Sequence, residues 1–454
     1  MTSPLRRRAR RAHDERGVAL VLTLLVLLGV GGLLAAYLAV STLEPQISRN
    51  LADASRARYL AEAGIERGFN VLIASADAAG GWSGLLAGAT TARPWVALDG
   101  LTNAVLAGGR FSVTIRNDNG AVDTPLTGLS ATTRPAMDTS PSVDSNTTVV
   151  MRASGTSNRA TKTIEVVVRR AALPRLAGAV NISAATTQTV FDAAELDIDG
   201  RDYACPGGGD LCDTALSWTP TSSPLKFGMA VPPGAEAAVE AALGSGAALD
   251  GVKGKSRTDS AGAYATGRDT VAGDATLSPA LVDELVRALA SNPSTTVLRS
   301  TPGCRLVVSG GASDASRTAT VANGCGPAMQ LDLGSRQDPR LVFVSGGLTL
   351  DRSVKGAGVL VVQDGDLTSQ GDLEWDGLVI AAGQPSAMTF AGGGRTTIRG
   401  AAIASDSRAD GAGGSGEFAI RGAAGRLSIR ASQQNVEMVQ VMRALHSITN
   451  WREI

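Results

Sequence analysis

VALVLTLLVLLGVGGLLAAYLAV (Val18–Val40) is an unbroken apolar run without a charged side chain. As a helix it would be about 35 Å long, which is enough to cross the hydrocarbon core of a bilayer. The segment before it carries six arginines and only two acidic residues: Arg6, Arg7, Arg8, Arg10, Arg11 and Arg16 against Asp14 and Glu15. This asymmetry predicts a single-pass inner-membrane helix, with residues 1–17 in the cytoplasm and Ser41 onward across the membrane.

Three interpretations of this stretch compete. A cleaved secretory signal has a shorter apolar core, of about 7–15 residues, than the one present here. A plain signal anchor explains both the length and the charge. The third interpretation depends on the border, where a basic leader ends in Gly17 and the apolar run begins at Val18 without a spacer.

This border, read together with ARYLAEAGIERGFN (Ala57–Asn70), resembles the N-terminal module of PilX-type minor pilins. The K-type minor pseudopilins of type II secretion are similar over the same region, about residues 15–75. The AEAG segment (Ala61–Gly64) makes the resemblance more specific than the glycine border alone.

The resemblance implies cleavage between Gly17 and Val18 by a prepilin peptidase. It also implies partners: other minor pilins, the major pilin, an inner-membrane assembly platform and a tip adhesin. Major pilins resemble one another in a glutamate at the fifth mature position, which is Leu22 here. A carboxylate in lipid is costly unless it is paired, so its absence suggests a subunit placed at a filament tip. Small residues would allow close helix packing in lipid: Gly29, Gly31, Gly32, Ala35 and Ala36.

The composition is rich in glycine, with 54 residues, and poor in aromatic residues, at 4 %. This is typical of thin, turn-rich β-structure. Lys plus Arg equals Asp plus Glu at 42 each, so net charge gives no reason to expect nucleic acid as a partner. The four cysteines form two local pairs, for which we expect disulfides Cys205–Cys212 and Cys304–Cys325 in an exported chain. Zinc is the alternative, but no CxxC is present and the two histidines are His13 and His446.

The predicted fold class is α+β: a long N-terminal helix followed by a mostly β head. After the leader, residues 18–75 form the helix, whose segment beyond the membrane has one apolar face at three- or four-residue spacing: Ala57, Ala61, Ile65, Phe69 and Leu72. Pro45 should kink or loosen this helix. Residues 76–172 are predicted as an antiparallel β head, with strands at Phe111–Arg116, Thr148–Ser154 and Thr161–Arg170.

Residues 173–340 are predicted as a mixed or inserted region with helices Glu236–Leu243 and Pro279–Ala290. Residues 341–454 contain short β-branched segments at roughly twenty-residue intervals, which suggests stacked rungs of a β-solenoid. The segments are Leu341–Leu350, Leu360–Ser369, Leu378–Gly383 and Ala401–Asp406. An ordinary β-sandwich is the rival. A helix at Ser432–Leu445 could cap the rungs, and Ile448–Ile454 could return as a final strand.

No catalytic constellation, cofactor motif or metal-ligand pattern stands out, so we expect a protein that is not an enzyme and takes no cofactor. Four aspartates near the rungs could bind calcium, although turn formation explains Asp in Asp-Gly pairs better: Asp364, Asp366, Asp372 and Asp376. The sequence therefore predicts a minor pilin or pseudopilin that primes or tips a type IV pilus-like filament. The alternative is a membrane-anchored β-solenoid that binds or cleaves surface polysaccharide.

Overall fold

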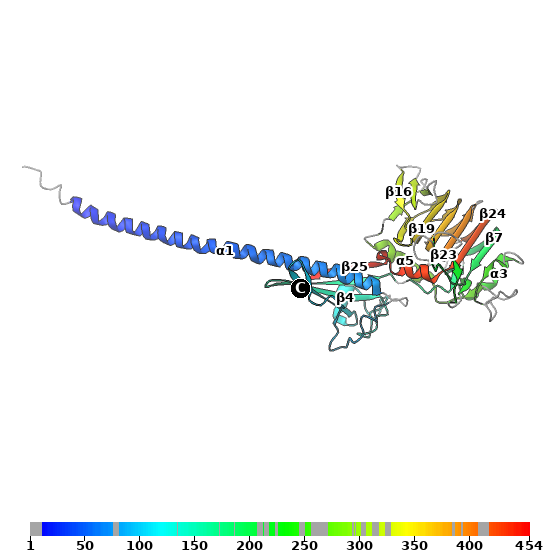
Figure 1. Cartoon of the computed structure of the whole chain (residues 1–454), viewed down its shortest axis with the longest axis horizontal. Coiled ribbons are helices and arrows are strands. Elements are labelled where there is room, and N and C mark those ends of the chain that lie inside the picture. The colour runs from blue at the N-terminus through cyan, green and yellow to red at the C-terminus, as the bar shows by residue number, and fades with distance from the viewer. Residues whose placement is uncertain are drawn as a thin grey trace, which may run out of the picture.

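In the computed structural model, one long helix leads into two β-structured modules (Figure 1). The structure describes residues 11–75, 81–133, 135–171, 173–185, 187–206, 212, 218–222, 226–244, 250–255, 271–292, 295, 297–300, 306–310, 317–322, 328–383, 386–391, 394–406 and 417–454. Helix α1 (Arg11–Ser75) contains the whole apolar run and continues without interruption through Pro45. The chain thus stays helical through Pro45, although a proline removes one backbone donor there.

The first module is an antiparallel sheet that we call the head sheet, with strand order β1-β3-β4-β5-β25 and β2 paired with β3. Its strands are β1 (Val96–Ala97), β2 (Ala104–Leu106), β3 (Gly109–Asn117), β4 (Thr148–Ser157), β5 (Ala160–Arg170) and β25 (His446–Glu453). The short helices η1 (Ala121–Asp123) and α2 (Thr124–Thr127) lie in the connection between β3 and β4. The three predicted head strands are thus present. Along β3, buried residues alternate with more exposed ones, which matches the alternating pattern in its sequence.

The second module, the coil domain, consists mainly of parallel strands stacked in register. Its strands are β6 (Gly178–Ile182), β7 (Gln188–Asp199), β10 (Phe227–Val231), β11 (Val252–Lys253), β12 (Val271–Gly273), β13 (Val297–Arg299), β14 (Leu306–Ser309), β15 (Thr318–Ala322), β16 (Met329–Asp332), β17 (Arg340–Ser345), β18 (Leu348–Asp351), β19 (Val354–Gln363), β20 (Leu367–Ser369), β21 (Leu373–Gly383), β22 (Ala387–Ala391), β23 (Arg395–Asp406) and β24 (Glu417–Ala431). β15 and β16 are antiparallel additions beside β14, and β8 (Tyr203–Ala204) pairs separately with β9 (Thr219–Pro220).

Successive coils repeat at the interval seen in the sequence. Leu348 pairs with Leu367 on the next coil, and Leu367 in turn pairs with Met388 on the one after it. These residues are buried inside the stack together with Phe418, which pairs with Met388 and packs against Phe390 at 6.1 Å between ring centroids. The strands of successive coils thus pair in parallel. The β-sandwich considered as the alternative is built from antiparallel strands, so the observed pairing differs from it.

A ladder of glycines runs across β19, β21 and β23. Gly358, Gly377 and Gly400 pair with one another in register, and all three have positive φ. A Cβ on Gly377 would lie 2.1 Å from the carbonyl oxygen of Gly358, and one on Gly400 would lie 1.9 Å from that of Gly377. Only glycine fits where the backbone has a positive φ and approaches a neighbouring strand this closely.

Strand pairing divides the chain differently from the sequence-based boundaries. β6 pairs with β23 and β7 with β24, so the residues of the predicted 173–340 region share one sheet with those of the 341–454 region. In the stack, β6 and β7 lie next to β23 and β24, the last coil in the sequence, and β10, β11 and β12 lie beyond β6 and β7. The next strands of the chain, β13 and β14, lie at the opposite end of the stack. β25 returns to the head sheet beside β5, as the predicted final strand, so the coil domain is inserted between two adjacent head strands.

Helices cover the stack. α3 (Glu236–Leu243) and α5 (Pro279–Ser291) lie where the sequence predicts them, and Ser278 caps α5 by accepting a hydrogen bond from the backbone of Leu281. α6 (Gln433–Gln440) is shorter than the predicted helix and is followed by η4 (Arg443–Leu445). α5 and α6 bury their apolar faces on strands β17, β19, β21 and β23, so α6 covers the side of the stack.

Candidate functional site: the N-terminal helix and its seat

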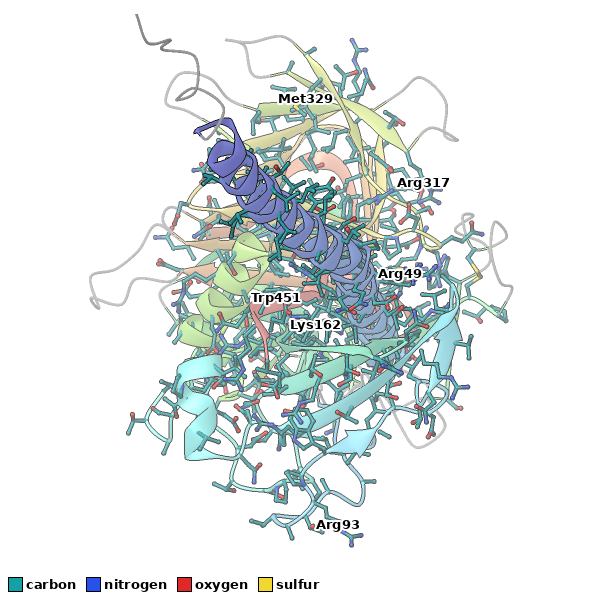
Figure 2. All side chains as sticks on the ribbon, turned by 90° about the vertical axis from the view of Figure 1, so that its left-hand side faces the viewer. Arg49, Arg93, Lys162, Arg317, Met329 and Trp451 are labelled. Carbon is teal, nitrogen blue, oxygen red and sulfur yellow. A yellow bond between two sulfur atoms is a disulfide. The ribbon has the colours of Figure 1, made fainter. Side chains whose placement is uncertain are left out.

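The N-terminal part of α1 projects away from the rest of the chain (Figure 1), and its described side chains from Val18 to Ala52 are exposed. In Figure 2, which is turned by 90°, this part of the helix runs toward the viewer. Val18–Val40 lies in the one helix of the described chain that is long and apolar enough to cross a membrane. Its large hydrophobic side chains are 47–73 % exposed, and Leu22 is 61 % exposed. Nothing lies within 4 Å of a Cβ built on Gly29, Gly31 or Gly32, and Ala35 and Ala36 are exposed as well. The predicted packing residues are therefore all available to a neighbour.

The backbone of Gly17 and Val18 is helical and continuous with the apolar segment. The side chains of residues 11–17 lie outside the described part of the chain, as does the whole leader before Arg11. The predicted cleavage position thus lies at the junction of the leader and the helix, and it stays a prediction.

An exposed apolar stripe continues beyond the membrane-length segment. Leu43, Ile47 and Leu51 are all more than half exposed and follow one another at four-residue spacing. At 100° per residue they share a face with the buried stripe that begins at Ala57 and includes Ile65. One continuous stripe is therefore covered by the protein's own head sheet in its C-terminal part and uncovered in its N-terminal part.

Glycines allow the C-terminal part of α1 to sit very close to the head sheet. A Cβ on Gly155 of β4 would lie 2.1 Å from the carbonyl oxygen of Ala57 and 2.4 Å from the backbone nitrogen of Ala61. On the helix side, a Cβ on Gly68 would lie 2.5 Å from the sulfur of Met151. The buried residues of this seat are Leu60, Ala61, Ile65, Phe69 and Leu72 on α1, and Phe111, Val113, Ile115, Met151, Ala153, Ile164, Val166 and Val168 on the sheet. The predicted apolar face thus packs on the head.

Polar contacts fix the helix at both ends of the seat. The Asn158 amide, in the turn between β4 and β5, donates to Asp53 at 2.8 Å. Near the other end, Arg443 donates to Glu66 at 2.8 Å, which ties α1 to the end of the coil domain. The Trp82 indole then donates to the carbonyl of Leu72 at 2.8 Å, satisfying an acceptor of the last turn.

His446 forms part of this seat, a role that sequence reasoning missed. It begins β25, is buried, and packs against Phe69 and Trp82 at 6.3 and 6.1 Å between ring centroids. Burial lowers its pKa to about 4, so the imidazole is neutral at pH 7. His446 is isolated in the sequence, and only the return of β25 beside β5 brings it to α1.

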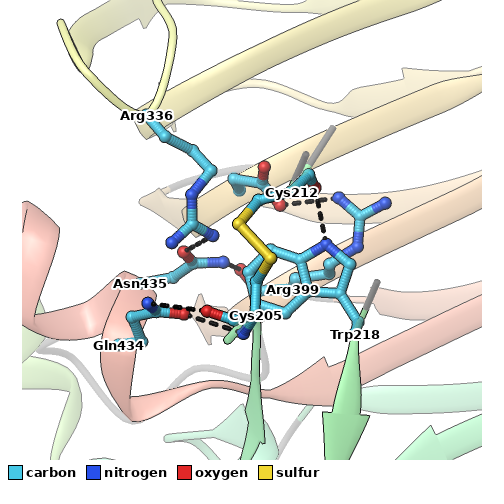
Figure 3. Close-up of a disulfide and its surroundings, with 8 residues drawn as sticks. Cys205, Cys212, Trp218, Arg336, Arg399, Gln434 and Asn435 are labelled. Atoms are coloured by element: carbon cyan, nitrogen blue, oxygen red, sulfur yellow. Dashed lines mark hydrogen bonds and ion pairs between the residues drawn. A yellow bond between two sulfur atoms is a disulfide. The ribbon is translucent and has the colours of Figure 1, made fainter. Parts of the chain in front are cut away.

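The disulfide between Cys205 and Cys212 lies beside helix α6 (Figure 3). Cys205 and Cys212 are bonded, as predicted, whereas Cys304–Cys325 lies outside the described residues. The Gln434 side chain of α6 accepts from the backbone nitrogen of Cys205 at 3.0 Å, and the Trp218 indole donates to the carbonyl of Cys212 at 2.8 Å. The ring of Trp218 lies over the guanidinium of Arg399, 5.0 Å from the ring centroid. Trp218 therefore covers a buried charge.

That charge belongs to an ion pair inside the coil domain. Arg399, of which 2 % of the side chain is exposed, donates to Asp376 at 2.7 Å and also binds Glu374. Asp372 accepts from the backbone nitrogen of Arg395 at 2.6 Å. Asp372 and Asp376 are thus engaged in structural contacts, and the described residues contain no group of three His, Cys, Asp or Glu side chains arranged to hold a metal.

Comparison with known proteins adds little to this geometry. No protein-family model matches the chain, and no curated protein sequence matches it. Among solved structures, the competence-associated pilin ComZ from Thermus thermophilus is similar over 88 % of this chain and 97 % of its own, with 11 % identity and a TM-score of 0.23. A TM-score this low carries no argument, so the functional conclusion rests on the chain's own structure.

Proposed function

We propose that this protein is a minor pilin or pseudopilin that takes part in assembling a type IV pilus-like filament, as a priming or tip subunit. The main observation in support is the uncovered half of the apolar stripe on α1. Leu43, Ile47 and Leu51 lie outside the membrane-length segment and are not covered by the head sheet. A stripe of this kind is stabilised when the apolar face of another subunit covers it.

In this proposal the subunit waits in the inner membrane with Val18–Val40 in the lipid. The prepilin peptidase removes the leader after Gly17, and the helix then leaves the lipid sideways into a helical bundle. The small residues of the apolar segment allow close approach of neighbouring helices. The partners are other minor pilins, the major pilin, the assembly platform and a tip adhesin, and the coil domain, a β-solenoid in this proposal, is displayed outward.

Leu22 supports a terminal rather than a repeating position. The resemblance implies that in major pilins the glutamate at this position pairs with the N-terminal ammonium of a neighbouring subunit. A leucine side chain cannot form that ion pair, so the subunit would lack one of the contacts that repeat along a shaft. We accordingly expect few copies per filament.

The test is the N-terminus of the mature protein, taken from a sheared filament fraction of the host. We expect it to begin at Val18, and we expect Gly17→Val to leave the precursor uncut, because the peptidase needs a small residue at the cut. The matched control is Gly29→Val, the same substitution within the apolar segment, which should be processed normally. Normal processing of Gly17→Val, or a mature protein that retains its arginines and never co-isolates with filaments, would refute the proposal.

A further inference from the structure

A cleft of about 530 Å³ lies between the head sheet and the coil domain. One wall comes from the end of the head sheet, through Thr147, Thr148 and Arg169, and the other from helix α5. Pockets of this size between modules are the usual places for small-ligand sites. The cleft is separate from the α1 surface on which the proposed filament role depends.

The charged side chains that line the cleft are mostly cations. Arg169, Arg170 and Arg287 line it, and Glu284 is the one carboxylate among its lining residues. Three guanidinium groups against one carboxylate favour an anionic occupant. The α5 wall adds apolar surface, through Leu281, Leu285 and Ala288.

Arg169 is the most informative of these cations. It donates through one terminal nitrogen to the carbonyl of Thr127, while its Nε atom is buried and has no hydrogen-bond partner among the described residues. Burial lowers the pKa of Arg169 despite the attraction of Asp118. A buried donor on a cation is costly when it has no acceptor, so this group is suited to an anion that enters from the cleft.

The neighbouring turn is held in a strained conformation. Thr147 has a φ of 57°, which is rare for a β-branched residue. Its hydroxyl oxygen lies 2.8 Å from the carbonyl oxygen of Arg170 and 2.7 Å from that of Asn146, so its single proton can be donated to either or shared between them. The turn thus gives this wall of the cleft a defined shape next to the unpaired guanidinium donor.

We propose that this cleft binds a small organic anion, a carboxylate or phosphate that carries an apolar group. Arg169 binds the charged end, Arg287 contributes from the opposite module, and the apolar part lies against α5. Because the walls belong to two modules, the bound anion strengthens the contact between the head sheet and the coil domain.

The test is a titration of the full chain, in detergent, with benzoate, phenyl phosphate and inorganic phosphate at constant ionic strength, followed by thermal unfolding and calorimetry. We expect saturable stabilisation by benzoate or phenyl phosphate. Preference between these two identifies the charged group, and weaker binding of inorganic phosphate identifies the contribution of the apolar part. Arg169→Gln should weaken binding at least tenfold, and so should Ala288→Phe, which fills the cleft without removing a cation.

The matched control is Arg159→Gln, which removes an exposed arginine from the turn between β4 and β5. It should bind the anions as the unsubstituted protein does. If Arg169→Gln fails to fold, Ala288→Phe and Arg287→Gln still test the site from α5. The proposal is wrong if none of the three anions binds saturably, or if the cleft variants bind them as tightly as Arg159→Gln does.

Discussion

Gly155→Ala should separate α1 from the head sheet. The added Cβ would lie 2.1 Å from the Ala57 oxygen, 2.4 Å from the Ala61 nitrogen and 2.8 Å from the Cβ of Leu60. Two of these are backbone atoms, which cannot rotate away, so the helix itself must retreat. Overpacking costs about 1–3 kcal/mol in typical cores, and we expect about 3 kcal/mol here, at the upper end of that range.

The same geometry predicts a graded series. A Cβ on Gly68 would meet the Met151 sulfur and a methyl group of Val113, which are side-chain atoms that can move, so Gly68→Ala should cost about 1 kcal/mol. Gly84 has nothing within 4 Å of its Cβ position and is the matched control, with an expected change within about 0.5 kcal/mol.

The assay is hydrogen exchange of the α1 amides between residues 57 and 72, together with the thermal transition of the full chain. Exchange should be fastest in Gly155→Ala, intermediate in Gly68→Ala and unchanged in Gly84→Ala. The reasoning about close approach fails if Gly155→Ala exchanges and melts like Gly84→Ala, because the helix would then tolerate a side chain where the structure leaves no room for one.

Three further predictions concern the buried charges and the disulfide. Arg399→Met should destabilise the coil domain by about 3–5 kcal/mol in denaturant unfolding, because it leaves Asp376 buried without its cation; a loss under about 1 kcal/mol would contradict this. Burial raises the pKa of Asp118 to about 6, so the folded state binds this proton more tightly than the unfolded state does. Relative to Asp118→Asn, the protein should therefore lose stability as the pH rises from about 4 to 6, and a flat difference between the two unfolding curves would count against it. Cys205→Ser should cost about 2.5 kcal/mol by the chain-entropy model and change the fluorescence of Trp218, and an unchanged spectrum would show that the loop does not hold the indole.

The sequence alone determined those helices, strands and bonds that depend on residues close together in the chain. The uncharged run Val18–Val40 and the apolar face from Ala57 to Leu72 predicted the long helix, because hydrophobic periodicity is a property of neighbouring residues. The twenty-residue repeats predicted the stacked strands for the same reason, and Ser278 with Pro279 predicted the start of α5. The short spacing of Cys205 and Cys212 likewise predicted their disulfide.

Only the tertiary structure decided which distant segments meet. The pairing of β6 with β23 joins the two ends of the coil domain's sequence, and the return of β25 to β5 places His446 beside α1. The cleft lined by Arg169 and Arg287 depends on the same arrangement. A strand or an apolar face is stabilised by the complementary surface against which the folded chain places it. That surface comes from residues distant in the sequence, so it cannot be predicted from neighbouring residues alone.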